Sequence, residues 1–181
     1  MNNLQNTIAN DLLTQFLESA QATGATVEMS QRNVQDLTAS LLRATADDQK
    51  VLFAQPDFIS PELFAQFILD GKVITKPTKD ELSSVTTGVT DAFGAVASTG
   101  SICVSVSGNP MGLVSLLTRK HIAVLDSRTI VPRPRDILES NTMDNLRRSF
   151  SLITGPSATA DMGPLVVGVH GPGQLHIIVL E

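Results

Sequence analysis

Apolar residues recur at helical spacing in the first third of the chain. Between residues 4 and 20 they return at every fourth position, which predicts an amphipathic helix that ends near Gly24. Ser30 is the expected N-cap of a second helix, whose apolar residues again lie three and four positions apart. A third helix is expected from Ser60 to near Gly71, because a proline and a glutamate follow that serine directly.

Short, continuously apolar runs alternate with these helices. Runs of this kind are typical of parallel strands that are buried on both faces of a sheet. The alternation therefore predicts an α/β fold with three layers, in which a mostly parallel sheet carries helices on both faces. The expected strands are residues 25–29, 50–54, 73–75, 121–125, 150–153 and 175–180.

Smaller signals complete the predicted element order. Thr78 and Glu81 have the spacing of a helix capping box. Two apolar triplets around Ser98-Thr99-Gly100-Ser101 indicate a β-hairpin with a glycine in its turn. Residues 83–100 are mostly small, which indicates a closely packed region and no linker, so we expect residues 1–181 to form one domain. Further predictions are a turn at 108–110, a short helix at 113–117 and a polar helix at 135–148.

Composition narrows the classes of function. The net charge of −5 and the absence of Trp and Tyr argue against nucleic-acid binding, which uses basic faces and stacked aromatic rings. Cys103 is the only cysteine, so an internal disulfide is excluded, and an iron–sulphur cluster, which needs about four thiolates, cannot be held by this chain alone. The three histidines have no metal-ligand spacing, so no metal site is expected.

The chain also lacks the sequence signals of export and membrane insertion. The first 31 residues contain no Lys or Arg, whereas a secretory signal begins with basic residues. No apolar run approaches the roughly 20 residues of a membrane-spanning helix. We therefore expect a cytoplasmic protein, and the unpaired cysteine agrees with a reducing compartment.

A polar loop rich in glycine and proline occupies residues 154–161, between apolar runs, and a second such stretch follows at 168–172. Loops held by a sheet commonly carry ligand contacts, although Gly-Pro-Ser is also ordinary turn chemistry. Ser157, Thr159 and Asp161 occupy alternate positions, so in an extended segment their side chains would point the same way. Asp161 is alternatively a helix N-cap.

These stretches resemble the LUD domain, the family of lactate-utilisation protein C. The resemblance rests on residues 155–161 and 167–172, with support from 97–101 and 116–124, and covers about residues 85 to 181. It implies a fold similar to glucosamine-phosphate deaminase, ribose-phosphate isomerase and CoA-transferase domains. It also implies a role in the oxidation of L-lactate to pyruvate together with iron–sulphur partner proteins. Those partners would hold the redox cofactors, while this chain would bind none and act as a scaffold or small-ligand-binding subunit.

Two segments, Thr99-Gly100-Ser101 and Gly155-Pro156-Ser157, are expected to form a cradle for a small carboxylate or phosphate. Exposed backbone N–H groups and hydroxyls suit anions, and Arg119 could add a bidentate cation, or could equally be a solvated charge before a buried strand. His170, flanked by glycines, is either an acid–base group or a turn-stabilising residue, and His121 and His176 are expected to be structural. The predicted ligand-binding set is Thr99, Gly100, Ser101, Arg119, Gly155, Ser157, Thr159, Asp161, His170 and Gly171, with His170 and Asp161 as the catalytic candidates.

The alternative function is a free-standing enzyme of the sugar-phosphate isomerase or acyl/CoA-transfer type. It would need a general base near its substrate, and the carboxylates that could serve are Asp91, Asp126 and Asp161. Ser98 stands where the family commonly has an acidic residue, so a catalytic carboxylate at that position would be lost here. A homo-oligomer is compatible with either function.

Overall fold

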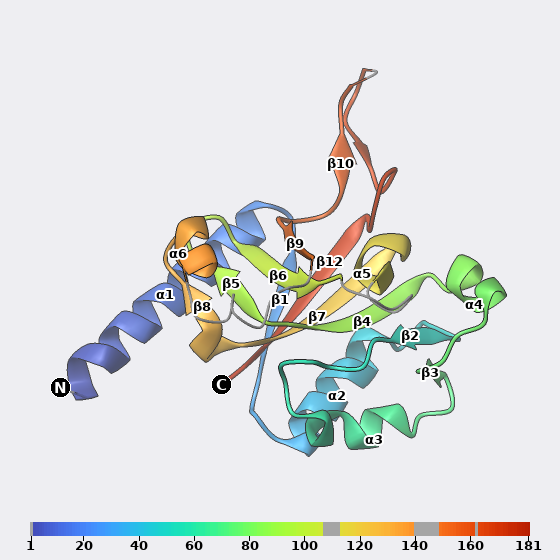
Figure 1. Ribbon diagram of the computed structural model, residues 1–181, viewed down its shortest axis with the longest axis horizontal. Helices are drawn as coiled ribbons and strands as arrows, with labels where there is room; N and C mark the ends of the chain where they lie inside the picture. The colour runs from blue at the N-terminus through green and yellow to red at the C-terminus, as the bar shows by residue number, and fades with distance from the viewer. Residues whose placement is uncertain (1, 107–112, 140–148, 162) are drawn as a thin grey trace.

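A sheet of six parallel strands forms the centre of the molecule, in the order β1-β12-β7-β4-β2-β3 (Figure 1). The structure is a computed structural model that describes residues 2–106, 113–139, 149–161 and 163–181. The parallel sheet confirms the predicted fold class, and five of the six predicted apolar runs contribute strands to it. The strands are β1 (Thr26–Ser30), β2 (Val51–Phe53), β3 (Val73–Ile74), β4 (Thr87–Ala92), β7 (Lys120–Asp126) and β12 (Gln174–Leu180).

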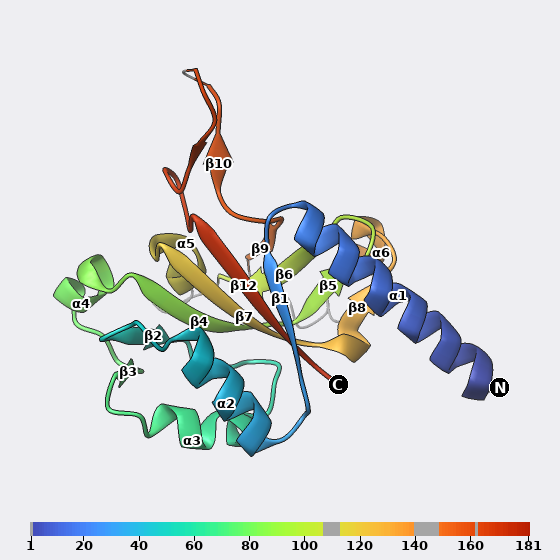
Figure 2. The same cartoon turned by 180° about the vertical axis from the view of Figure 1, so that it is seen from behind.

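Alternate residues of the central strands face two separate cores. On β7, Ile122 and Val124 pack in one core, under α2, η1 and α3, whereas Ala123 and Leu125 face α1 in the other. Helices therefore cover both faces of the sheet (Figures 1 and 2). The helices are α1 (Asn2–Ala22), α2 (Val34–Ala44), η1 (Pro61–Phe64), α3 (Ala65–Ile68), α4 (Lys79–Ser84), α5 (Val114–Leu117), η3 (Ser127–Thr129) and α6 (Pro134–Glu139).

A smaller sheet shares one face of the central sheet with α1. The chain runs from β4 through Phe93 directly into this sheet, whose strand order is β8-β5-β6-β9. Strands β5 and β6 are antiparallel, which confirms the predicted hairpin, and the predicted run at 150–153 is β9. The apolar pattern did not predict this separation into two sheets. The strands are β5 (Gly94–Val96), β6 (Ser101–Ser105), β8 (Ile130–Val131) and β9 (Phe150–Ile153).

The polar loop near the C-terminus forms a projecting arm. Strands β10 (Ala158–Thr159) and β11 (Val166–Val167) pair antiparallel and stand away from both sheets (Figures 1 and 2). The arm starts after β9 and returns to the first residue of β12, so it is anchored at the amino end of a central strand.

Several local predictions are confirmed and others are corrected. The capping box of Thr78 and Glu81 is present at the start of α4. Ser30 is not the N-cap of α2, because it is still part of β1; Asn33 takes that role by accepting the N–H of Asp36. The third helix begins as a 3₁₀ turn, and Ser60 forms no capping bond. Strand β4 was not predicted. The predicted turn at 108–110 and the predicted helix after Glu139 lie outside the described residues.

Candidate functional site

Three adjoining hollows surround the base of the arm, at the amino ends of the central strands. The cationic hollow, of about 430 Å³, is lined by Arg119, Lys120 and Gln174, among others. The neutral hollow, of about 390 Å³, is lined by residues that include Ser115 and His121. The third hollow, of about 430 Å³, shares Lys120 and Gln174 with the cationic one. Open parallel sheets usually bind ligands at the carboxyl ends of their strands. These hollows lie at the other edge of the sheet, where the strands begin.

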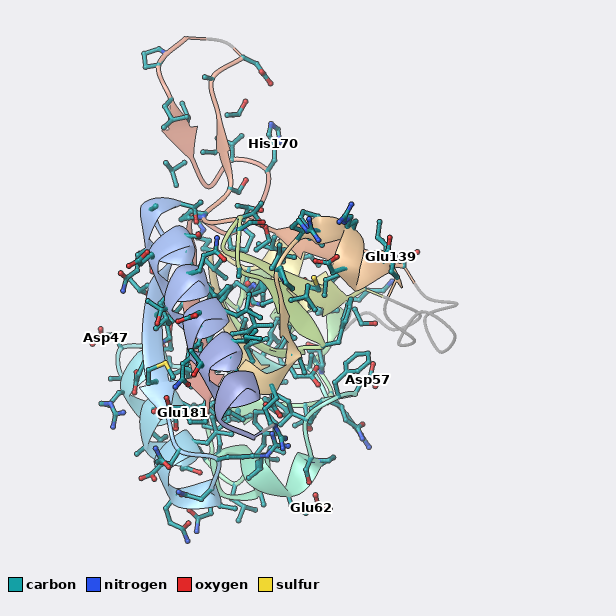
Figure 3. All side chains as sticks on the ribbon, turned by 90° about the vertical axis from the view of Figure 1, so that its left-hand side faces the viewer. Asp47, Asp57, Glu62, Glu139, His170 and Glu181 are labelled. Carbon is teal, nitrogen blue, oxygen red and sulfur yellow. The ribbon has the colours of Figure 1, made fainter. Side chains whose placement is uncertain are left out.

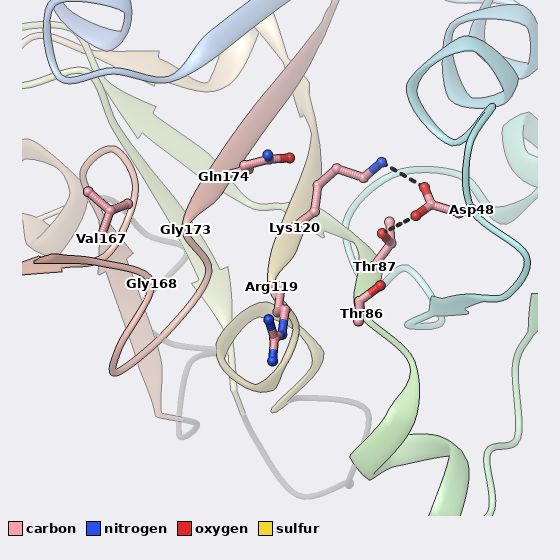
Figure 4. Close-up of a pocket in the computed structure, with 9 residues that line it drawn as sticks. All are labelled: Asp48, Thr86, Thr87, Arg119, Lys120, Val167, Gly168, Gly173 and Gln174. Carbon is pink, nitrogen blue, oxygen red and sulfur yellow. Dashed lines mark hydrogen bonds and ion pairs between the residues drawn. The ribbon is translucent and has the colours of Figure 1, made fainter.

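An ion pair is built into the wall of the cationic hollow (Figure 4). Lys120 Nζ lies 2.6 Å from Asp48 Oδ2 and donates to the carbonyl oxygen of Ala44 at 3.0 Å. The Thr87 hydroxyl donates to the other oxygen of Asp48 at 2.6 Å. Because Asp48 already compensates the charge of Lys120, this lysine mainly holds the ends of β4 and β7 against the turn after α2.

Arg119 is the cation in this hollow whose charge is not compensated. Its backbone N–H is bound by the Thr86 carbonyl at 2.8 Å, which fixes the start of β7, and its side chain is exposed. Within the described parts of the chain, no carboxylate pairs with its guanidinium group, and its side chain points away from that of Lys120 (Figure 4). A guanidinium in this position is free to bind a carboxylate or phosphate through two parallel hydrogen bonds.

Two buried polar side chains line the neutral hollow. His121 is fully buried, with Nε2 at 2.9 Å from the Thr90 hydroxyl, as expected for a structural histidine. Burial lowers the pKa of its imidazole to about 4, so the ring is neutral near pH 7. Its Nδ1 and the hydroxyl of Ser115 are both buried, and neither has a hydrogen-bond partner among the described residues.

Four of the predicted ligand-binding residues come together around this neutral hollow. They are Gly155, Ser157, His170 and Gly171. The loop is held by its own backbone, since the N–H of Ser157 donates to Pro172 at 2.8 Å and the N–H of Gly168 donates to Ser157 at 2.7 Å. Ligand binding by these residues stays a prediction.

Thr99, Gly100 and Ser101 lie under α1. A Cβ added at Gly100 would lie 2.3 Å from the backbone nitrogen of Ala20, so this glycine allows the helix to approach closely. The Ser101 hydroxyl lies 2.7 Å from each of two other hydroxyls, those of Thr99 and Thr154. These hydroxyls therefore satisfy one another.

The remaining predicted residues are dispersed. Thr159 and Asp161 lie on the arm, where the threonine hydroxyl donates to the carboxylate at 3.0 Å. Arg119 lines the cationic hollow, whereas Ser157 and His170 line the neutral one. The two segments of the expected cradle adjoin, since the hydroxyls of Ser101 and Thr154 meet at 2.7 Å. Arg119, which was expected to complete the cradle, lines a separate hollow.

Asp91 and Asp126 lie towards the carboxyl ends of their strands, away from the hollows. Asp91 accepts the backbone N–H groups of residues 57–59 at 2.7 to 3.1 Å. Burial raises the pKa of this carboxyl, although the three N–H groups favour its charged form. Asp126 pairs with Arg32 and Arg128. Asp57 is one of the residues that Asp91 binds, and Figure 3 shows it well separated from His170 on the arm.

The described residues contain no group of three or more His, Cys, Asp or Glu side chains that could hold a metal ion. No helix in the same part of the chain is both long and apolar enough to cross a membrane.

The ligand-binding residues predicted from the sequence do not include Ser115, His121, Lys120 or Gln174. Lys120, His121 and Gln174 are among the first residues of β7 and β12. The apolar pattern predicts these strands but does not indicate which of their residues contact a hollow. Only the pairing of β7 between β12 and β4 brings these strand ends together.

Comparison with known proteins identifies the family. The model of the LUD domain matches residues 7–180. The chain belongs to the LUD domain family. The match covers nearly the whole chain, including the first half, where the sequence resemblance was limited to the order of helices and strands.

Curated relatives of this LUD protein share part of their length with it. Lactate utilization protein C of Halalkalibacterium halodurans is 39% identical over an alignment of 101 residues that covers 52% of this chain and 44% of that protein. The Bacillus subtilis protein of the same name is 36% identical over 100 residues, with coverages of 52% and 42%. The matched part thus spans less than half of these relatives.

A solved structure has the same fold. The crystal structure of a DUF162 family protein from Deinococcus radiodurans superimposes with a TM-score of 0.69 and 20% sequence identity. The superposition covers 96% of this chain and 98% of that one. At this identity the similarity concerns the fold alone.

Proposed function

We propose that this protein acts in lactate utilisation as a subunit that binds a small carboxylate, while iron–sulphur partner proteins transfer the electrons. The names of its relatives support the pathway. The observation that carries the proposed binding role is the exposed guanidinium of Arg119, which lines the cationic hollow and has no carboxylate partner among the described residues.

The chemistry of the cationic hollow suits L-lactate or pyruvate. Each of these molecules has one carboxylate and one further oxygen on the neighbouring carbon. Arg119 would bind the carboxylate, and the hydroxyl of Thr86, which also lines the hollow, can donate to the second oxygen. A volume of about 430 Å³ is within the usual range of small-molecule sites.

The cysteine content supports the proposed division of labour with iron–sulphur partners. Cys103 is the only cysteine of the chain; it is buried on β6, and burial raises the pKa of its thiol to about 12. An iron–sulphur cluster needs about four thiolates. In the proposal such clusters are held by other chains, and we assign the arm, with its exposed residues Leu165, Val166, Val167 and Val169, to their binding.

Isothermal titration calorimetry with L-lactate and with pyruvate tests the carboxylate site. We expect saturable binding of at least one of them, and roughly 10- to 100-fold weaker binding by Arg119→Gln, because a charge-assisted pair is removed. Arg133→Gln is the matched control, since that arginine is also exposed but lies beside Asp136 in another part of the molecule. Absence of binding by the wild-type protein, or equal binding by Arg119→Gln, would contradict the proposal.

A further inference from the structure

We infer that the neutral hollow is a second ligand site, which takes an uncharged molecule with an apolar body and one hydroxyl or carbonyl group. This inference goes beyond the proposed carboxylate site, and it depends on different residues.

Two unpartnered polar atoms carry the inference. His121 and Ser115 are both fully buried, yet the imidazole Nδ1 and the serine hydroxyl have no hydrogen-bond partner among the described residues. Nearly all buried polar groups in folded proteins are hydrogen-bonded, because an unsatisfied group is destabilising. Both residues line the same hollow. The two atoms are covered in this structure, so a bound molecule supplies their missing partners once the side chains that cover them are displaced.

The lining determines the charge of the ligand. None of the described residues that line this hollow is a Lys, Arg, Asp or Glu; its two histidines are His121, at its buried end, and His170, which is exposed on the arm. Burial keeps His121 neutral near pH 7, so it cannot compensate an anion. A charged group placed beside His121 and Ser115 would lose its water without gaining an opposite charge, which is strongly unfavourable.

The walls determine the body of the ligand. Leu116, Leu152 and Leu175 line the hollow together with two prolines and other apolar residues. Leu116 and Leu152 remain 38% and 43% exposed, so a ligand would cover apolar surface that water now contacts. Apolar walls with a few convergent polar groups are the usual composition of a small-molecule site.

A hydroxyl suits the two polar atoms best. Thr90 binds Nε2 of His121, and either atom can be the donor, so Nδ1 is an acceptor in one tautomer and a donor in the other. A hydroxyl both donates and accepts, so it fits either tautomer. A carbonyl oxygen fits the tautomer with hydrogen on Nδ1, and it also accepts from Ser115.

The test uses three probes of similar size: 4-methylphenol, toluene and 4-methylbenzoate. Calorimetric titrations are made on the full chain and on Arg119→Gln, which removes the free cation of the other hollow. We expect 4-methylphenol to bind both proteins equally. Toluene, which lacks the hydroxyl, should bind at least about 10-fold more weakly than 4-methylphenol. In Arg119→Gln, 4-methylbenzoate should also bind at least about 10-fold more weakly than 4-methylphenol.

Ser115→Ala separates a ligand site from a packing defect. The variant should bind 4-methylphenol about 10-fold more weakly and toluene unchanged, because one hydrogen bond is lost. Its melting temperature should be equal or higher, since the removed hydroxyl has no partner among the residues that the structure describes. In protein with ¹⁵N-labelled histidine, 4-methylphenol should shift the Nδ1 resonance of His121.

Three outcomes would overturn the inference. They are no binding of 4-methylphenol by the wild-type protein, equal binding of 4-methylphenol by Ser115→Ala, and a loss of 4-methylphenol binding in Arg119→Gln. The first two would indicate that ordered water satisfies the buried groups. None of the three bears on whether lactate or pyruvate binds at Arg119, so the two proposals fail independently.

Discussion

Asp91 and His121 are buried polar residues on the neighbouring strands β4 and β7, and their surroundings differ. Three backbone N–H groups bind one oxygen of Asp91, so this carboxylate holds residues 57–59 to the sheet. Within the described part of the chain, His121 has a partner for only one of its two ring nitrogens. The first arrangement is typical of a structural anchor, whereas the second leaves a polar atom able to bind a ligand.

Asp91→Ala should lower the free energy of unfolding by roughly 2 to 4 kcal/mol, because three buried N–H groups lose their acceptor. Asp91→Asn should be less destabilising, since its amide oxygen can still accept. Urea unfolding measures both variants. Asp161→Ala, on the exposed arm, is the control and should stay within about 0.5 kcal/mol of wild type. Wild-type stability of Asp91→Ala would show that Asp91 does not hold this segment.

The pH dependence of stability should report on His121. Its pKa falls from 6.5 to about 4 on folding, so between these values the unfolded chain binds more protons. The free energy of unfolding should therefore decrease as the pH is lowered from 7 to 5, by up to about 1 kcal/mol per unit below pH 6.5. Burial also lowers the pKa of His176, which acts in the same direction. Asp91, whose pKa is raised, acts in the opposite one.

Urea unfolding at pH 7, 6 and 5 measures this effect. His121→Gln should have a flatter dependence than wild type, because it removes the largest contribution. His170→Gln, at an exposed histidine on the arm, is the matched control for the replacement itself. An unchanged slope in His121→Gln would mean that His121 is protonated in the folded protein as readily as in the unfolded chain.

Helix α1 is fixed to the second sheet and to the loop after β9 by two glycines. Gly100 and Gly155 have φ values of +65° and +66°, which side chains with a Cβ rarely adopt. A Cβ at Gly155 would lie 2.3 Å from the carbonyl oxygen of Thr23, and one at Gly100 would meet the backbone of Ala20. Both glycines of the predicted anion cradle thus have a packing role at this helix.

Gly100→Ala and Gly155→Ala should each lower the free energy of unfolding by roughly 2 kcal/mol or more, through strain at positive φ and displacement of α1. Thermal unfolding followed by circular dichroism measures the loss. Gly71→Ala is the control, because nothing lies within 4 Å of its added Cβ and its φ is not in the left-handed region. If the variants of Gly100 and Gly155 are as stable as Gly71→Ala, α1 does not require these glycines.

Elements with a strong local pattern could be predicted, whereas β4 could not. The helix after residue 4 and strands β7 and β12 have periodic or continuous apolar residues, so their burial is evident from the chain itself. Strand β4 reads Thr-Gly-Val-Thr-Asp-Ala, yet all six residues are buried. Its burial comes from neighbours distant in sequence: β2 and β7 pair with it, and Val114 of α5 packs where Gly88 has no side chain.

The whole molecule consists of a body closed around two cores and an arm that projects from it. The arm carries Leu165, Val166, Val167 and Val169, which are all at least half exposed. Apolar residues in such a row are unfavourable in water and are typical of surfaces that bind another protein. This is the surface that we assign to the iron–sulphur partners.

The double variant Leu165→Ser and Val169→Ser should lose association with the iron–sulphur proteins of the lactate-utilisation system. Its free energy of unfolding should change by less than about 0.5 kcal/mol, because both side chains are largely exposed. Co-purification from cells that express the components together measures association. Leu69→Ser is the control, since Leu69 is 84% exposed on another part of the surface. Full association of the arm variant would exclude the arm as the binding surface.

The sequence by itself determined the α/β class, the order of most helices and strands, the family and the position of the loop that contacts the neutral hollow. These features depend on local periodicity and on a contiguous motif. Only the tertiary structure decided which residues meet. It separated Arg119 from Ser157 and His170, paired the hydroxyls of Thr99 and Ser101 with neighbours, and brought Ser115 beside the same hollow as His121. The reason is that strand order and register, which local patterns do not encode, determine which chain segments form each edge of the sheet.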